Sequence, residues 1–363
     1  MLKINMEVNV LKKYIMLFIL PLTILLSSCS PSKTPVKNPP PSKELSRYTI
    51  SDYYPFRENV KMSYLGNGSE YASQDIYFDF IKGDTAQIRM VNPGTTIGRI
   101  IENKNGELSL LKSREEFFYK DNLSLLNNTS FDKEVLLKEP LTLGNTWPIP
   151  NGARRTITNT AANVATPYGT YKALEVTTES ADYKTKDYYA LNIGLIKSVF
   201  FLDNFEISSS LEKIDSNAYL VQNIKLFYPE ILSNDMRLVF TNIKTPIKTN
   251  DEIKNIFQKY FANPPKNNLT PLISKNTKIN KLYLNPSENK VYIDFSNEFI
   301  DEMNLGSSVE LSVINSITST LGNYYNVNKV YITVNDSPYT SGHIALDHGE
   351  SFTVDSKNSV ELK

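Results

Sequence analysis

The stretch VYIDFSNEF, residues 291–299, decides the fold of the C-terminal part of the chain. Val291, Ile293 and Phe295 stand at alternate positions, so they share one face of a strand and predict a half-buried β-strand. The turn formers NPSEN precede it at residues 285–289, and residues 281–284 form another short apolar stretch before the turn. Together the two stretches predict a β-hairpin with one buried face.

Helix and strand patterns surround this hairpin. Apolar residues recur at helical spacing in residues 253–261 and 313–321, and Asn263-Pro264-Pro265 ends the first of these runs. Strand patterns cover residues 224–228, which end at Pro229, and residues 236–243 and 329–334. Residues 220–350 therefore predict an α+β domain in which two helices pack on a small sheet.

Two pairs of residues have the spacing of a capping box. Thr249 stands three residues before Glu252, and Ser307 stands three residues before Glu310. In a capping box the two side chains accept hydrogen bonds from backbone N–H groups that have no partner at the start of a helix. We therefore expect these four residues to be structural helix caps.

Several phrases of this domain resemble the sporulation and germination (GerMN) domain of the GerM type. They are residues 224–229 (IKLFYP), 269–279 (LTPLISKNTKI), 291–299 (VYIDFSNEF), 306–310 (GSSVE) and 342–346 (GHIAL). One departure is Asn263-Pro264-Pro265, where family members commonly have a Gly-Pro pair. The resemblance implies a non-catalytic interaction domain, similar in fold to the ring-building modules of envelope assemblies. It also implies an extracytoplasmic lipoprotein of a Gram-positive bacterium. Some members of the family act in sporulation and germination.

Residues 47–215 follow a different pattern. Short aromatic and β-branched stretches alternate with turns such as Gly66-Asn67-Gly68 and Lys82-Gly83-Asp84, which is typical of an antiparallel meander. A flat meander would leave its edges and one apolar face in water. We therefore expect an open barrel or a curled sheet, with Trp147 in its core.

The N-terminus has the features of a bacterial lipoprotein signal peptide, residues 1–28. Two lysines precede an apolar run, residues 14–26, which is shorter than the roughly 20 residues that a membrane-spanning helix needs. The sequence LSSC at residues 26–29 resembles a lipobox, whose cysteine receives a diacylglycerol. An ordinary signal peptide with a chance cysteine is the alternative. Because Cys29 is the only cysteine of the chain, we predict that it is the lipidation site.

The segments at the two ends of the mature chain are expected to lie outside its domains. Residues 29–46 are rich in Pro, Ser and Lys and have almost no large apolar side chain, which predicts an extended tether. Residues 351–363 are expected to form a C-terminal tail. These features predict an extracytoplasmic protein that a lipid holds on the outer face of the cell membrane.

The charge pattern gives no sign of a nucleic-acid partner or of a cofactor. The chain has 39 basic and 39 acidic side chains, with no basic block of the kind that binds phosphates. His343, Asp347 and His348 are the one cluster of metal-ligand type, and we expect a solvated loop there instead of a metal site.

Paired carboxylates are the remaining candidates for chemistry. Asp294, Glu298, Asp301 and Glu302 crowd one stretch, as general acid and base work would require. Asp294 alternates with the inward-facing positions of its strand, so we expect a solvent-exposed acidic face. No Gly-rich phosphate loop and no G-x-S-x-G motif occurs. We therefore expect no catalytic residues and no enzyme activity.

Two functional hypotheses remain. The first is a membrane-anchored interaction or scaffold module that binds an envelope protein or a cell-wall component, or that forms a homo-oligomer. Sporulation, germination and cell-wall assembly are its candidate processes. The second is a lipoprotein carrier or sensor that holds an apolar ligand in the N-terminal β domain. A deep apolar cavity in that domain would favour the second, and a filled core with exposed sheet edges the first.

Overall fold

The computed structural model describes residues 48–125, 132–202, 205–233 and 235–362. The predicted signal peptide and tether, residues 1–46, lie outside the described residues. Within the described part of the chain the strands form three sheets, and none of its helices is long and apolar enough to cross a membrane.

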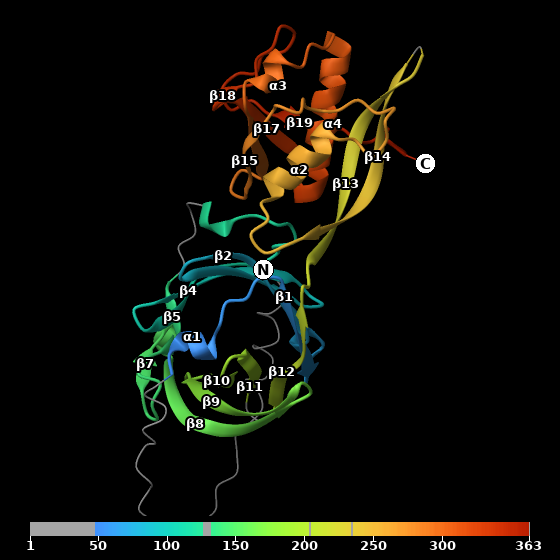
Figure 1. The fold of residues 1–363 in the computed structure, drawn as a ribbon. Helices are drawn as coiled ribbons and strands as arrows, with labels where there is room; N and C mark the ends of the chain where they lie inside the picture. The colour runs from blue at the N-terminus through green and yellow to red at the C-terminus, as the bar shows by residue number, and fades with distance from the viewer. Residues whose placement is uncertain (1–47, 126–131, 203–204, 234, 363) are drawn as a thin grey trace, which may run out of the picture. The chain divides into compact units, whose positions relative to one another are not determined.

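Twelve antiparallel strands form the first sheet, which curls around until it is nearly closed (Figure 1). Their bounds are β1 (Val60–Asn67), β2 (Gln74–Lys82), β3 (Thr85–Val91), β4 (Thr96–Lys104), β5 (Glu107–Arg114), β6 (Glu134–Lys138), β7 (Thr146–Pro148), β8 (Arg154–Thr166), β9 (Gly169–Glu179), β10 (Lys184–Ala190), β11 (Gly194–Leu202) and β12 (Phe205–Ser216). Strands β1 to β6 and strands β7 to β12 each form a meander, and the pairing of β1 with β12 joins the two. The prediction of a mainly antiparallel, curled β region is confirmed.

Side chains bridge the two ends of this curled sheet, β6 and β7. The Arg155 guanidinium donates to the Val135 carbonyl at 2.6 Å and pairs with the Glu134 carboxylate at 2.5 Å. The Trp147 indole N–H also donates to the Val135 carbonyl, at 2.9 Å. Trp147 thus links β7 to β6, and Arg155 of the next strand, β8, also bonds to β6, although no ladder pairs the two end strands.

Apolar side chains fill the interior of the curled sheet. Val60, Met62 and Tyr64 alternate along β1 and belong to one cluster of buried residues. Ile50 of the short helix α1 (Ile50–Tyr53) belongs to a second cluster, with Trp147. Trp147 is buried, as the sequence predicts. In the part of the chain that the structure describes, short 3-10 helices lie among the strands: η3 (Glu70–Ala72), η4 (Leu123–Leu125) and η5 (Pro150–Gly152).

A long hairpin follows the curled sheet. Its strands are β13 (Leu220–Ile231) and β14 (Met236–Ile247), and β20 (Val360–Glu361) adds to β14 in parallel. The sequence predicts that the first strand ends at Pro229, but β13 continues past it. Because β13 is the edge strand of this sheet, a proline can stand where its missing N–H costs no ladder hydrogen bond.

The third sheet contains the predicted hairpin. Its strands are β15 (Ile279–Asn285), β16 (Lys290–Phe295), β17 (Lys329–Val334) and β18 (Ser337–Pro338), with β19 (Phe352–Thr353) also paired to β17. The helices are α2 (Ile253–Ala262), α3 (Glu298–Asp301) and α4 (Ser307–Tyr325). Strands β16 and β17 are parallel because α4 crosses over between them. Residues 351–363, expected as a tail, contribute β19 and β20.

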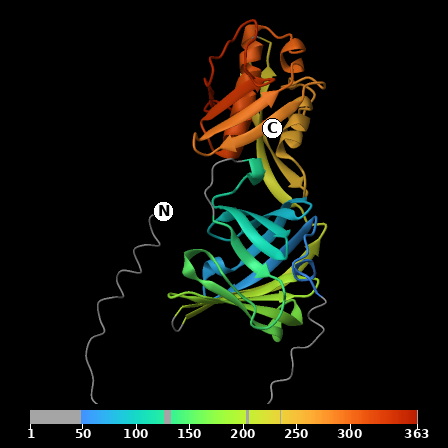
Figure 2. The same ribbon diagram turned by 90° about the vertical axis from the view of Figure 1, so that its left-hand side faces the viewer.

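Helix α4 packs between two sheets (Figure 1, Figure 2). It contacts β13 on one side and β16 and β17 on the other, while α2 contacts β15. Val313, Ile317 and Leu321 recur along α4 and are completely buried in the shared apolar core. This arrangement confirms the predicted α+β fold with two helices on a small sheet.

Candidate functional site

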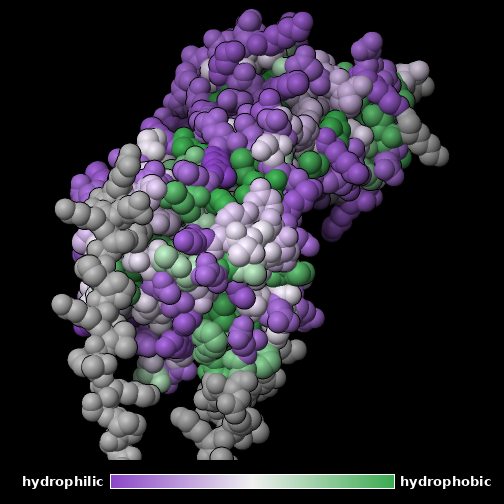
Figure 3. Space-filling model, turned by 60° about the horizontal axis from the view of Figure 1, so that its bottom comes forward, coloured by the Kyte–Doolittle hydropathy of each residue, from purple (hydrophilic) through white to green (hydrophobic). Residues whose placement is uncertain are grey.

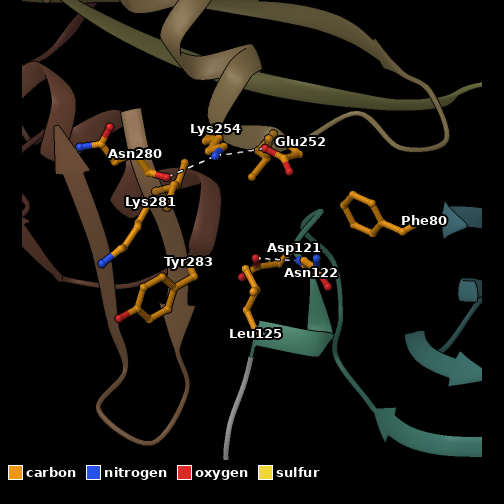
Figure 4. Close-up of a pocket in the computed structure, with 11 residues that line it drawn as sticks. Phe80, Asp121, Asn122, Leu125, Glu252, Lys254, Asn280, Lys281 and Tyr283 are labelled. Carbon is orange, nitrogen blue, oxygen red and sulfur yellow. Dashed lines mark hydrogen bonds and ion pairs between the residues drawn. The ribbon is translucent and has the colours of Figure 1, made fainter. Parts of the chain in front are cut away.

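A groove of about 480 Å³ runs along the outer edge of β15 (Figure 4). Residues 280–283 of β15 form one side, and residues 252–254 at the start of α2 form the end. Opposite β15 lie residues of the segment between β5 and β6 and one residue of β2: Asp121, Asn122, Leu125 and Phe80. The groove therefore combines residues of the curled sheet with residues of the C-terminal α+β region.

Strand β15 has an unpaired edge facing this groove. It is the terminal strand of its sheet, and among the described residues no strand pairs with it on the side away from β16. The Leu284 N–H donates to the Asp121 carboxylate at 3.2 Å, so it points away from β16. Backbone direction alternates along an antiparallel strand, so the N–H and C=O of Leu282 point the same way. A free sheet edge of this kind can accept another strand.

Asp121 is the buried carboxylate at the side of the groove, with only 3% of its surface exposed. Burial raises the pKa of Asp121 to about 7, and hydrogen bonds from the N–H groups of Leu284 and Asn122 oppose this rise only in part. The Gln87 amide donates to the Asp121 carbonyl at 2.8 Å and fixes the backbone at this point.

A buried polar network holds the segment that carries Asp121. The Arg89 guanidinium pairs with the Asp79 carboxylate at 2.8 Å and donates to the Tyr119 carbonyl at 2.8 Å. The Lys120 ammonium donates to the carbonyls of Asp79 and Lys248, at 3.1 and 2.7 Å, and burial lowers the pKa of Lys120 to about 8. These bonds tie the groove wall both to the curled sheet and to the end of β14.

A second buried carboxylate, Glu310, lies in the first turns of α4. Its Oε1 accepts hydrogen bonds from the Tyr339 hydroxyl at 2.8 Å and the Ser341 hydroxyl at 2.5 Å, and its Oε2 lies 2.7 Å from His343 Nδ1. Burial acts to raise the pKa of Glu310, but the hydrogen bonds from Ser341, His343 and Tyr339 outweigh it and leave this pKa below its usual value. Glu310 thus fastens the loop after β18 to α4.

The predicted second capping box is therefore not formed. The N-cap of α4 is Gly306, and no side chain caps the helix there. Ser307 is the first residue of α4, and the Glu310 side chain is engaged by Tyr339, Ser341 and His343. The loop after β18 supplies these three donors, and the local sequence does not show that this loop approaches α4.

The predicted first capping box is replaced in a similar way. The N-cap of α2 is Glu252, which makes no side-chain cap bond and instead pairs with Lys254 at 3.2 Å. The Thr249 hydroxyl donates to the Phe78 carbonyl and accepts from the Asn59 N–H, both at 2.8 Å. Thr249 therefore connects the end of β14 to the curled sheet.

The acidic stretch is not a uniform exposed face. Asp294 is only 3% exposed, because it accepts hydrogen bonds from the Thr333 hydroxyl, the Asp336 N–H and the Asn280 amide. The side chains of Glu298, Asp301 and Glu302 do not share this burial. Among the described residues, no three His, Cys, Asp or Glu side chains converge in a way that could hold a metal ion. Cys29, the predicted lipidation site, lies outside the described residues.

The sequence does not indicate the groove. Residues 281–284 are predicted as a strand, but nothing local shows that this strand is at an edge or that Asp121 lies beside it. Asp121 stands in an irregular segment with no recognisable motif. The groove depends on contacts between residues more than 100 positions apart, which a local pattern does not report.

Comparison with family models finds one match, described as Germane: sporulation and spore germination, over residues 225–340. The match covers β15, β16, α2, α4 and β17, the elements that form one side of the groove and its neighbours. Residues 225–340 are thus the part of the chain that is similar to the Germane domain. The resemblance to the GerM type is thereby confirmed for this part of the chain. No curated protein matches the chain.

Solved structures also match parts of the chain. A candidate lipoprotein from Clostridium perfringens is 20% identical, over 37% of this chain and 87% of that one, with a TM-score of 0.25. The tandem GerMN domains of the sporulation protein GerM from Bacillus subtilis are 16% identical, over 37% of this chain, with a TM-score of 0.29. The match spans 46% of that GerM chain.

A third structure matches a larger part of the chain. It is a candidate exported protein with a YmcC-like fold from Bacteroides fragilis. It is 15% identical, over 45% of this chain and 99% of that one, with a TM-score of 0.28.

Proposed function

We propose that this protein is a non-catalytic, lipid-anchored envelope protein whose Germane domain binds a partner protein through the free edge of β15. The observation that carries the proposal is the unpaired β15 edge beside a groove. A sheet edge offers backbone hydrogen bonds to an added strand, which is a common mode of protein recognition. The Germane match supports a role in sporulation, germination or another envelope process.

The arrangement of polar residues supports a binding role over a catalytic one. The Ser341 hydroxyl lies close to His343, but it donates to Glu310 and accepts from the backbone N–H groups of His343 and Ile344. A nucleophilic serine would instead donate to a histidine nitrogen. These residues therefore fasten a loop and do not form a nucleophile and base pair.

The packing of the curled sheet argues against the carrier hypothesis. Side chains of the two apolar clusters occupy its interior, and Leu108, Ile157, Leu174 and Ile196 are completely buried there. An apolar ligand would need a cavity of a few hundred Å³ at that place. On the face that Figure 3 shows, hydrophobic side chains gather only in small patches among hydrophilic ones. The interaction hypothesis is therefore the one that we retain.

The membrane anchor is the second part of the proposal. A cysteine that follows Leu26-Ser27-Ser28 and has no partner for a disulfide is a suitable lipidation site. The Pro- and Ser-rich residues 29–46 would then hold the folded part at a distance from the membrane. Diacylation of Cys29 would place the groove outside the cytoplasm, where an envelope partner can reach it.

Three full-length variants, expressed in cells that lack the native copy, test both parts. Leu125 at the groove and Leu143 away from it are 61% and 62% exposed, so a change to Asp at either position leaves folding largely intact. We expect Leu125→Asp and Cys29→Ala to reproduce the deletion phenotype, and Leu143→Asp to restore function. Membrane fractionation should find only Cys29→Ala released from the membrane.

Each result has a clear opposite. Full function of Leu125→Asp at normal protein levels would contradict binding at the groove. Normal processing and membrane retention of Cys29→Ala would contradict the lipid anchor. Loss of function on changing the polar residues Glu298 and His348 to Gln, with Leu125→Asp tolerated, would favour a reaction centre.

A further inference from the structure

We propose that the groove binds an extended, uncharged peptide segment with apolar side chains at alternate positions, which adds one strand to β15 at Leu282. This inference rests on the proposed function and names the partner's chemistry. It follows from three features: the backbone groups at the edge, the wall opposite the edge, and the charges in the groove.

Along the free edge of β15, within the described part of the chain, Leu282 has backbone groups without a hydrogen-bond partner, whereas Asn280 and Leu284 on either side of it each have a backbone group that is bonded. The Asp121 carboxylate accepts from the Leu284 N–H, and the Lys254 ammonium donates to the Asn280 carbonyl at 3.2 Å. These side chains satisfy the edge at both ends in place of a neighbouring strand. Leu282 lies between them, and among the described residues no group pairs with its outward N–H and C=O. An added strand would therefore pair at Leu282.

The opposite wall restricts the partner to a single segment. A paired strand lies about 4.8 Å from its neighbour, and each further strand of a folded sheet needs the same distance again. Asp121, Asn122 and Leu125 stand opposite β15 (Figure 4), and the Asp121 carboxylate reaches the β15 backbone at Leu284. One extended segment fits between this wall and β15, whereas the edge of a second folded sheet does not.

The length of the groove sets the length of the segment. Four residues of β15, 280–283, line the groove. At about 3.4 Å per residue, a partner of about four or five residues spans this edge, with its ladder hydrogen bonds at Leu282. The volume of about 480 Å³ lies in the usual range for ligand sites.

The side chains of the groove favour an uncharged, partly apolar partner. Lys254 already pairs with Glu252, and Lys281 already pairs with Asp336. The oxygens of the Asp121 carboxylate already accept from the N–H groups of Leu284 and Asn122. A charged partner would therefore find no opposite charge among these groups that is free to pair with it and would lose its hydration. Phe80, Leu125 and Tyr283 offer apolar contacts. Because side chains alternate along a strand, the residues of the partner that face this surface are two apart.

The test uses the full chain in detergent micelles and a fluorescent form of the peptide acetyl-Thr-Val-Thr-Val-Thr-amide. Fluorescence polarisation measures its dissociation constant. We expect Leu125→Asp to weaken binding by about tenfold or more, because a charge enters the groove, and Leu143→Asp to leave it within about twofold. A peptide with Glu in place of Thr should bind about tenfold more weakly.

Two further measurements identify the mode of binding. Two peptides are N-methylated at every second residue, one at the odd and one at the even positions, so each lacks the N–H donors on one of its edges. We expect about tenfold weaker binding for the peptide whose methylated residues would donate to β15. Hydrogen exchange by NMR should show the Leu282 N–H slowed several-fold by saturating peptide. The Leu284 N–H, which already donates to Asp121, should change less.

The outcomes separate this inference from the proposed function. No binding, equal binding by all peptides, or unchanged exchange at Leu282 would overturn the inference. If Leu125→Asp is also null in cells, the groove still binds a partner, but of another kind, such as a second copy of this chain. If Leu125→Asp functions normally in cells, both the proposed function and this inference fail.

Discussion

Asp121 and Glu310 are two buried carboxylates in different surroundings: Asp121 lies beside the groove at β15, and Glu310 holds a loop on α4. Their exposed fractions are 3% and 2%, so desolvation acts on both. Asp121 accepts two backbone N–H groups, and its pKa rises to about 7. Glu310 has donors on three side chains, and its pKa falls below the usual value. Burial alone therefore does not decide the charge of a carboxylate; the number and kind of donors do.

The difference in hydrogen-bond donors between Asp121 and Glu310 also distinguishes a candidate binding surface from a structural contact. Glu310 has its oxygens fully engaged by a loop of its own domain, so nothing remains for a partner. Asp121 stands beside a free sheet edge, and its two backbone donors do not fully compensate for lost hydration. Both of its oxygens accept a hydrogen bond, but its pKa is raised by burial, and carboxylates with shifted pKa values are frequent at functional sites. We therefore place the partner at Asp121 and the structural role at Glu310.

The largest expected effect is on Glu310. Glu310→Ala should lower the free energy of unfolding by about 3 kcal/mol, because the buried Tyr339 hydroxyl and the Ser341 hydroxyl lose their acceptor. Urea denaturation at pH 7 measures this loss. Since the folded pKa of Glu310 is lowered, its contribution is present above the unfolded value of 4.5 and is lost as the pH falls below it. Glu310→Gln, which keeps one acceptor oxygen, is the control and should lose less.

Asp121→Asn should change the free energy of unfolding in the opposite direction, by raising it at high pH. The folded pKa is about 7 and the unfolded value is 3.8, so the folded chain binds more protons between these pH values. The contribution of Asp121 to stability therefore falls as the pH rises from about 4 to 7. Asp121→Asn should remove this slope and raise the free energy of unfolding above pH 7 by roughly 1–3 kcal/mol.

The measurement is denaturation of both proteins from pH 4 to 8. Asn keeps one carbonyl oxygen that can accept from the Leu284 N–H, but its NH2 group cannot accept from the Asn122 N–H. The loss of that bond does not depend on pH, so the slope with pH, and not the absolute stability, reports the effect of charge. Equal slopes for the wild type and the variant would mean that Asp121 titrates normally and would remove the contrast with Glu310.

The smallest expected losses of stability are those of Ser307→Ala and Thr249→Ala, which distinguish a local helix cap from a long-range hydrogen bond. Ser307 begins the helix that carries Glu310 but caps nothing, so Ser307→Ala should cost less than about 0.5 kcal/mol, whereas a cap would cost about 1 kcal/mol. Thr249 bonds to Phe78 and Asn59 across to the curled sheet, so Thr249→Ala should cost about 1–2 kcal/mol. Thermal denaturation of the two variants side by side measures both. Equal losses would support the capping boxes that the sequence predicts.

Elements with strong local patterns were predictable. The hairpin around VYIDFSNEF forms as β15 and β16, and the two helical runs form α2 and α4, because their period places apolar side chains on one face. The Gly- and Asn-rich turns likewise predict the meander of the curled sheet. The short strands β6 and β7 are not predictable in this way, since each is held by its partner strand and by the Arg155 and Trp147 bonds.

Local sequence patterns did not predict which polar residues are buried. Asp294 alternates with inward-facing residues of β16, which predicts exposure, yet Thr333 and Asp336 of the neighbouring strand and turn cover it and bond to it. Glu310 has capping-box spacing, yet the loop around Ser341 reaches it first. In both cases the partner is more than 30 residues away, so only the folded chain brings the donor to the acceptor.

The sequence by itself determined the elements of the α+β region, the meander of the curled sheet and the candidate lipid anchor at Cys29, because each depends on neighbouring residues. The tertiary structure alone decided the pairing of β1 with β12, the roles of Thr249 and Glu310, and the groove at β15. These features join residues that are distant in the chain. Their free energy comes from long-range burial and hydrogen bonding, which no local periodicity encodes.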